Sequence, residues 1–183
     1  RFSMLNPDLK HIIYSSTTLE FVTVGVEFCS FLEKMEPTSK DEWIKKALRI
    51  LPLLYIKATL LPDIEPLDSH SIETFVKEQD YTIVSKHVES MLGEDDVYLD
   101  VFIEDMKYSD RPISSFISED IADIYQDIRN FISIYQYNIE ESMAGALYRC
   151  VENFHSYWGQ KLVNVLRPLH NLAYHHFDQD LKQ

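Results

Sequence analysis

Apolar residues recur at intervals of three and four along most of the chain, which is the spacing of one buried face on an α-helix. Residues 21–35 carry the first such run, and Pro37, which cannot continue a helix, follows it. Upstream, Asn6-Pro7-Asp8 supplies a capping side chain, a proline suited to the first helical position and an acid in the first turn. The pattern predicts helices over both stretches.

A second helix is predicted to begin at Ser39, because Ser39-x-x-Glu42 has the spacing of a capping box. Residues 47–61, "ALRILPLLYIKATLL", are apolar nearly all round. This stretch is too short and too charged to span a bilayer. We therefore expect the central and most buried helix of the molecule here, kinked at Pro52.

A third helix is predicted to end at Gly93, since glycine readily adopts the conformation that closes a helix. The next residues, 94–117, are acidic and are expected to form a connector, with a short helix around residues 97–102. Residues 176–183 are expected to form a frayed tail. No run alternates between apolar and polar residues clearly enough to predict a sheet.

Two further helices complete the pattern. The fourth begins near Ser118 and places the apolar residues Ile121, Ile124, Ile128, Ile132 and Tyr135 on one face. The last and longest runs past Trp158 towards His170. Only four glycines occur in 183 residues, which suits a bundle. We predict an all-α fold: residues 1–183 form a single-domain helical bundle of about five main helices, with one long C-terminal helix.

The charge balance excludes several classes of partner. A net charge of −13 argues against nucleic acid and against anionic membranes, which both attract basic proteins. No glycine-rich phosphate loop is present. Cys29 and Cys150 lie in apolar helical patterns and are expected to be buried free thiols. Without a visible signal-peptide pattern, the sequence favours a cytoplasmic location.

Glu152-x-x-His155 has the spacing of half of a di-metal site in a helical bundle. Such a site needs a second pair, and the nearest relative, Asp8-x-x-His11, lies in the first turn of the first helix. The helical angles place His155 at the border of the apolar arc and Glu152 further towards solvent. We therefore predict no metal site and no cofactor.

The sequence also gives little support to two other catalytic arrangements. Glu33-x-x-Glu36 and Glu65-x-x-Asp68 superficially match the paired carboxylates of helical Mg²⁺-dependent pyrophosphohydrolases, but prolines interrupt both motifs. Cys150 points about 140° away from His155 around the helix, so the two cannot pair directly. The histidines near the C-terminus, at positions 170, 175 and 176, are expected to be structural or adventitious. No catalytic residue is predicted.

The acidic residues are concentrated in one part of the chain. Between positions 94 and 127 lie eleven acids and two bases, which is −9 of the total charge of −13 within 34 residues. On the predicted fourth helix Asp120, Asp123 and Asp127 share one arc, away from the isoleucine face. This arrangement favours a solvated helix face. The alternative is a docking surface for a basic partner or for the basic residues Lys45, Lys46 and Arg49 of a second copy.

If the region binds a partner, apolar residues between the acids must add affinity, because exposed ion pairs are individually weak. Ile113 and Phe116 are among the residues available for this purpose. The candidate partner-binding residues are Asp96, Tyr98, Phe102, Asp120, Asp123 and Asp127.

Four segments, "EFVTVGVEFCSFLE", "YSDRPIS", "SEDIADIYQD" and "YWGQKLVNVLRPLH", resemble a family of small bacterial proteins described as a domain of unknown function. The resemblance covers residues 16–174. It implies a bacterial, soluble, all-helical domain and carries no catalytic residues.

Together these observations favour a non-catalytic protein-interaction or scaffold domain over an enzyme. Its expected partner is a basic protein surface or a second copy of the chain. The alternative is a ligand-binding protein, or a metal-dependent hydrolase of helical type, with a pocket that the sequence does not reveal.

Overall fold

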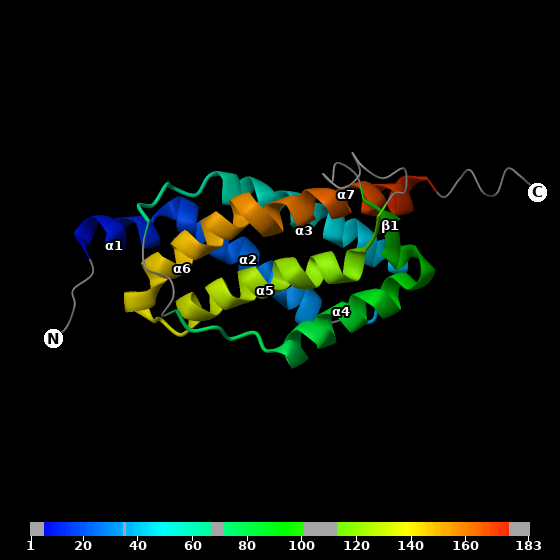
Figure 1. Ribbon diagram of the computed structural model, residues 1–183, viewed down its shortest axis with the longest axis horizontal. Coiled ribbons are helices and arrows are strands. Elements are labelled where there is room, and N and C mark those ends of the chain that lie inside the picture. Colours follow the sequence, from blue (N-terminus) through cyan, green and yellow to red (C-terminus); the bar gives the residue numbers. More distant parts are fainter. Residues whose placement is uncertain (1–5, 35, 67–71, 101–112, 176–183) are drawn as a thin grey trace, which may run out of the picture.

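The computed structural model describes residues 6–34, 36–66, 72–100 and 113–175. Figure 1 shows an elongated bundle of helices that run along its long axis. The helices are α1 (Pro7–Ile13), α2 (Ser16–Lys34), α3 (Lys40–Thr59), α4 (Glu78–Leu92), α5 (Ile117–Gln136), α6 (Glu140–Asn153) and α7 (Gly159–Tyr174). The predicted all-α bundle is confirmed. Among the described residues, the lengths and hydropathies of the helices leave none that could serve as a membrane span.

Helix α5 occupies the centre of the bundle, in contact with α2, α4, α6 and α7 (Figure 1). Its predicted apolar face is confirmed, since Ile121, Ile124, Ile128 and Ile132 are all buried. The approach of α2 is close, because a Cβ added to Gly25 would lie 2.8 Å from Ile132 Cδ1. The buried side chains of the helices form one core cluster around α5.

The expectation that α3 is the central helix is wrong. Its inner face is buried, but Leu53 and Ile56 on its outer face are 44% and 52% exposed, and Leu60, directly after the helix, is 53% exposed. The helix packs mainly on α2 and α7, on one side of the bundle. Its predicted start is confirmed, because Ser39 Oγ accepts a hydrogen bond from the Glu42 N–H at 3.2 Å.

The predicted long C-terminal helix is present as a continuous helical run from α6 through a π-helical turn (Phe154–Trp158) into α7. Trp158 is fully buried, and its indole Nε1 donates to the Cys150 carbonyl oxygen at 3.0 Å. A Cβ added to Gly159 would lie 2.4 Å from the Phe154 carbonyl oxygen. The turn therefore requires glycine at that position.

Two short strands, β1 (Val97–Leu99) and β2 (Ser114–Phe116), form an antiparallel pair with Val97 opposite Phe116. The expected short helix around residues 97–102 is therefore wrong for residues 97–99, and residues 101 and 102 lie outside the described residues. Gly93 ends α4 with φ of 59°, as predicted, and a 3₁₀ turn over Gly93–Asp96 leads into β1.

Candidate functional site

The acids of α5 form a hydrogen-bonded network with groups from three other elements. Asp120 is buried; it accepts hydrogen bonds from the Tyr98 hydroxyl on β1 and, at 3.3 Å, from Lys161 Nζ on α7. Asp123 accepts from the Tyr81 hydroxyl of α4 at 2.8 Å and pairs with the same Lys161 Nζ at 3.1 Å. The network therefore joins α4, β1 and α7 to α5.

Asp127 lies one turn further along α5 and accepts a hydrogen bond from Asn153 Nδ2 at 3.0 Å. Beside it is a cavity of about 20 Å³, lined among others by Asn130 and Arg149. A space of this size has room for about one water molecule and none for a substrate. Asp127 is thus a packed residue rather than the wall of a ligand pocket.

Burial perturbs the ionisation of these groups. It raises the pKa of Asp120 above its usual range, although the hydrogen bond from Tyr98 and the charge of Lys161 oppose the shift. Burial also raises the pKa of Asp127 to about 6, assisted by the charge of Asp123 and opposed by the hydrogen bond from Asn153. For Lys161, burial would lower the pKa, but the nearby carboxylates of Asp123 and Asp120 raise it overall.

The interpretation of Asp120, Asp123 and Asp127 as one solvated stripe is wrong. The Asp120 and Asp123 side chains are only 9% and 16% exposed, and both are paired within the molecule. The helical angles correctly placed the three aspartates away from the isoleucine face. They do not show whether another element of the fold packs on the polar face of a helix. Because α5 is central, other elements do cover its polar face, and the basic partner of the acids is Lys161 rather than a residue of α3.

Asp96, another candidate residue, is also buried. Its carboxylate accepts hydrogen bonds from the Ser118 N–H at 2.7 Å and the Ser118 hydroxyl at 2.6 Å, and so caps the first turn of α5. Tyr98 is 7% exposed and points to Asp120. Phe102 lies outside the described residues. Asp96 and Tyr98 therefore hold the β-hairpin against α5.

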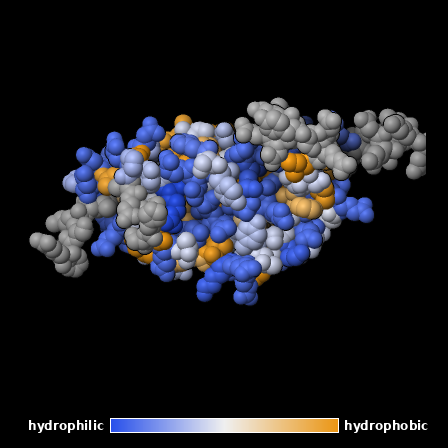
Figure 2. All heavy atoms as spheres, viewed as in Figure 1, coloured by the Kyte–Doolittle hydropathy of each residue, from blue (hydrophilic) through white to orange (hydrophobic). Residues whose placement is uncertain are grey.

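The same hairpin exposes a different set of side chains, which we call the hairpin surface. Four large apolar residues on and beside the two strands are between 38% and 52% exposed: Val97, Leu99, Ile113 and Phe116. Figure 2 shows mostly hydrophilic side chains on the viewed face, with hydrophobic side chains at several places, among them the end of the molecule where β1 lies. The sequence did not predict that Val97 and Leu99 contribute, because a strand of three residues is too short to show alternation.

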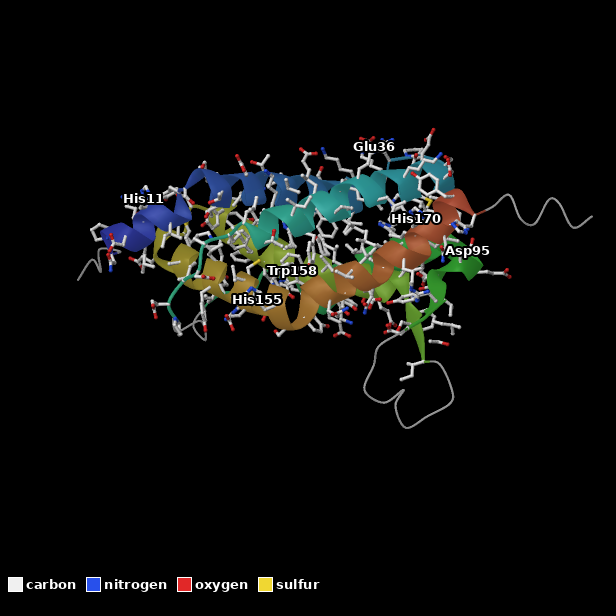
Figure 3. The ribbon with its side chains drawn as sticks, turned by 90° about the horizontal axis from the view of Figure 1, so that it is seen from above. His11, Glu36, Asp95, His155, Trp158 and His170 are labelled. Carbon is white, nitrogen blue, oxygen red and sulfur yellow. The ribbon has the colours of Figure 1, made fainter. Side chains whose placement is uncertain are left out.

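The hairpin surface is fixed to the bundle on its other side. Arg167 of α7 donates a hydrogen bond to the Leu99 carbonyl oxygen. Arg167 also lines an open groove of about 600 Å³ between α3 and α7, together with Leu48, Pro52, Leu166, His170 and Tyr174. Figure 3 looks onto this side of the molecule, with His170 on α7 next to α3.

The structure places the candidate metal-binding motifs of the sequence in different parts of the molecule. Glu152 and His155 are both exposed, and His155 lies far along the molecule from His170 (Figure 3). Glu33 accepts a hydrogen bond from the Tyr125 hydroxyl at 2.6 Å and faces Arg129 at 3.7 Å. Within the described ranges, no three potential metal ligands of the histidine, cysteine or carboxylate type lie close enough together to hold an ion.

Both cysteines are free and buried, as predicted. Burial raises the pKa of the Cys29 thiol to about 12, with a smaller contribution from the charge of Glu33. Burial likewise raises the pKa of the Cys150 thiol well above its usual value. Since the thiolate is the nucleophile, neither residue is poised for covalent catalysis near neutral pH.

The comparisons with known proteins identify a family and name no reaction. A comparison with curated proteins found no match. The crystal structure of protein BF1032 from Bacteroides fragilis is 42% identical, covers 89% of this chain and 96% of its own, and superposes with a TM-score of 0.79. Residues 12–175 match a family described as a domain of unknown function (DUF5063). The resemblance read from the sequence is thus confirmed, and the chain belongs to this family.

Proposed function

We propose that the chain is a non-catalytic protein-interaction or scaffold domain, and that it docks a partner protein through the hairpin surface. The observation that carries this proposal is the exposure of Val97, Leu99 and Phe116 on one face of the hairpin, where Val97 lies opposite Phe116. Apolar side chains scattered singly over a surface need no explanation, but a contiguous group is typical of interaction sites.

The charges around the hairpin surface favour a basic partner. Glu94 and Glu119, at its border, are exposed, and the whole chain carries −13. Charges at the rim chiefly raise the rate of association, whereas the apolar residues at the centre supply affinity. This division fits an acidic surface whose buried acids, Asp96 and Asp120, hold the hairpin in place and do not touch the partner.

The chain acts as one domain, which the single core cluster supports. Its location is the cytoplasm, which the two free thiols support, since oxidising compartments favour disulfides.

The proposal can be tested by site-specific photo-crosslinking in bacterial cells that express the protein naturally. A benzophenone amino acid replaces Leu99 in one variant and Ile83 of α4 in a control variant, because these side chains are 52% and 47% exposed. We expect a discrete crosslinked protein of basic composition from position 99 and none from position 83.

A second variant separates docking from incidental proximity. Leu99→Lys removes an apolar contact and adds a charge that repels a basic partner, while the backbone hydrogen bond from Arg167 to residue 99 is retained. Purified partner should bind this variant at least about tenfold more weakly at unchanged melting temperature. Equal crosslinking from both positions, or unchanged binding by Leu99→Lys, would contradict the proposal.

A further inference from the structure

The outer face of α3 carries a second group of exposed side chains, half basic and half apolar, which we call the α3 stripe. It consists of Lys45, Lys46 and Arg49 in the first half of the helix and Leu53, Ile56 and Leu60 at its end. Two of its bases have partners within the chain, since Lys45 pairs with Asp41 at 2.9 Å and Lys46 lies over the Phe31 ring. At about 100° per residue, all six fall within about 100° of arc, opposite the buried side chains of the same helix. Leu53, Ile56 and Leu60 are each about half exposed, from 44% to 53%.

Charge changes sign along this stripe. Its first half is basic on balance, with three bases and the exposed acid Glu42 on the same arc. Its middle is apolar, and the chain that leaves it carries two exposed acids, Asp63 and Glu65. Within the part of the chain that the structure describes, Arg49, Asp63 and Glu65 form no ion pair with one another or with other residues. The basic and acidic ends thus leave these charges available to a partner.

A pattern that runs from basic through apolar to acidic is complementary to itself when reversed. We propose that a second copy of this chain packs antiparallel on the α3 stripe, about a two-fold axis near Ile56. A two-fold axis brings the same patch of both copies together, so each contact occurs twice. Arg49 of each copy then faces Asp63 and Glu65 of the other, while the apolar residues meet at the axis.

The shape of this side of the molecule fits the same occupant. Figure 3 shows α3 and α7 side by side on one face, and the groove lined by Leu48, Pro52 and Leu166 runs next to the stripe. A shallow open groove beside a helix suits an apolar helix edge better than it suits a small molecule, which binds in enclosed pockets. Three half-exposed apolar side chains per copy place the interface at the small end of specific dimers, so we expect a dissociation constant on the order of micromolar.

Dimerisation through the α3 stripe does not depend on the hairpin surface, and the variants below distinguish the two surfaces. Sedimentation equilibrium of the full chain between about 1 and 200 μM should reveal a reversible monomer–dimer equilibrium. Ile56→Glu should weaken dimerisation by about a hundredfold, because it places two like charges opposite one another at the axis. Ile83→Glu on α4, which alters a side chain that is 47% exposed elsewhere, and Leu99→Lys on the hairpin should leave the dimer unchanged.

Charge exchange tests the antiparallel arrangement itself. Arg49→Glu and Asp63→Lys should each weaken self-association about tenfold or more, because each introduces like charges at both ends of the interface. A one-to-one mixture of the two variants should recover the native affinity, since both contacts are then between opposite charges. Circular dichroism melts check that every variant is folded. A chain that stays monomeric throughout, a control that weakens the dimer as much as Ile56→Glu, or a mixture that does not recover would overturn the proposal.

Discussion

Helices α3 and α5 each contain twenty residues, yet α5 buries twelve side chains and α3 buries six. The difference follows from their surroundings. Helix α5 is contacted by α2, α4, α6 and α7, whereas α3 packs mainly on α2 and α7 (Figure 1). Between these two helices, the larger number of buried side chains thus goes with the larger number of neighbouring elements.

The two helices also differ in whether their charged and apolar side chains are buried. The central position of α5 encloses the Asp120 carboxylate, which is tolerated because Tyr98 and Lys161 donate hydrogen bonds to it. The peripheral position of α3 leaves Ile56 more than half exposed. An acid is inside and an isoleucine is outside, and both facts depend on which neighbours each helix has.

The difference in burial between the two helices is tested most directly by truncating an isoleucine on each of them. Ile128 of α5 is 0% exposed and Ile56 of α3 is 52% exposed. Ile128→Ala should lower the free energy of unfolding by about 2–5 kcal/mol through lost burial and a cavity. Ile56→Ala should change the stability of the monomer by about 0.5 kcal/mol or less.

Urea unfolding at a low protein concentration, where the chain is monomeric, measures both values. Leu54→Ala is the control within α3, because Leu54 lies on the buried face of that helix and should behave like Ile128. Similar losses for Ile56→Ala and Ile128→Ala would mean that α3 is as enclosed as α5.

The next effect concerns the acid of α5 that lies beside the small cavity. The pKa of Asp127 is raised to about 6 by burial, whereas an unfolded aspartate titrates near pKa 3.9. The folded chain therefore binds more protons between these values, and the free energy of unfolding falls as pH rises through this window. The size of this contribution is about 2–3 kcal/mol between pH 4 and pH 7.

Asp127→Asn removes the titration and keeps an oxygen that can accept from Asn153. The variant should lose less stability than the native chain between pH 4 and pH 7, as measured by urea unfolding at several pH values. The charges that face Asp127 are those of Asp123 and Arg149, and both remain in the variant. Glu119→Gln, at an exposed position on the same helix, is the control. Identical pH profiles for native chain and Asp127→Asn would show that Asp127 is not titrating in this window.

Local signals in the sequence predict much of the fold. The cap at Ser39, the helix end at Gly93 and the isoleucine face of α5 each depend on residues a few positions apart, and all are confirmed. The network around Lys161 could not be predicted in this way, because Lys161 and Asp120 are 41 residues apart and meet only through packing. Strands of three residues leave too short a pattern to recognise.

The starts of the two helices offer the last and smallest contrast. Helix α3 is capped by its own preceding residue, Ser39, at an exposed site. Helix α5 is capped from 22 residues away by Asp96, which is buried and accepts from both the N–H and the hydroxyl of Ser118. Ser39→Ala should therefore cost about 1 kcal/mol, the usual value of an exposed cap.

Asp96→Ala should cost about 2 kcal/mol, because it leaves two buried donors of Ser118 without an acceptor. The double variant Asp96→Ala, Ser118→Ala keeps only the backbone N–H unsatisfied and should recover part of that loss. Thermal and urea unfolding of the three variants give the comparison. A loss for Asp96→Ala no larger than that for Ser39→Ala would mean that water reaches the start of α5, and that this end of the central helix is as open as the start of α3.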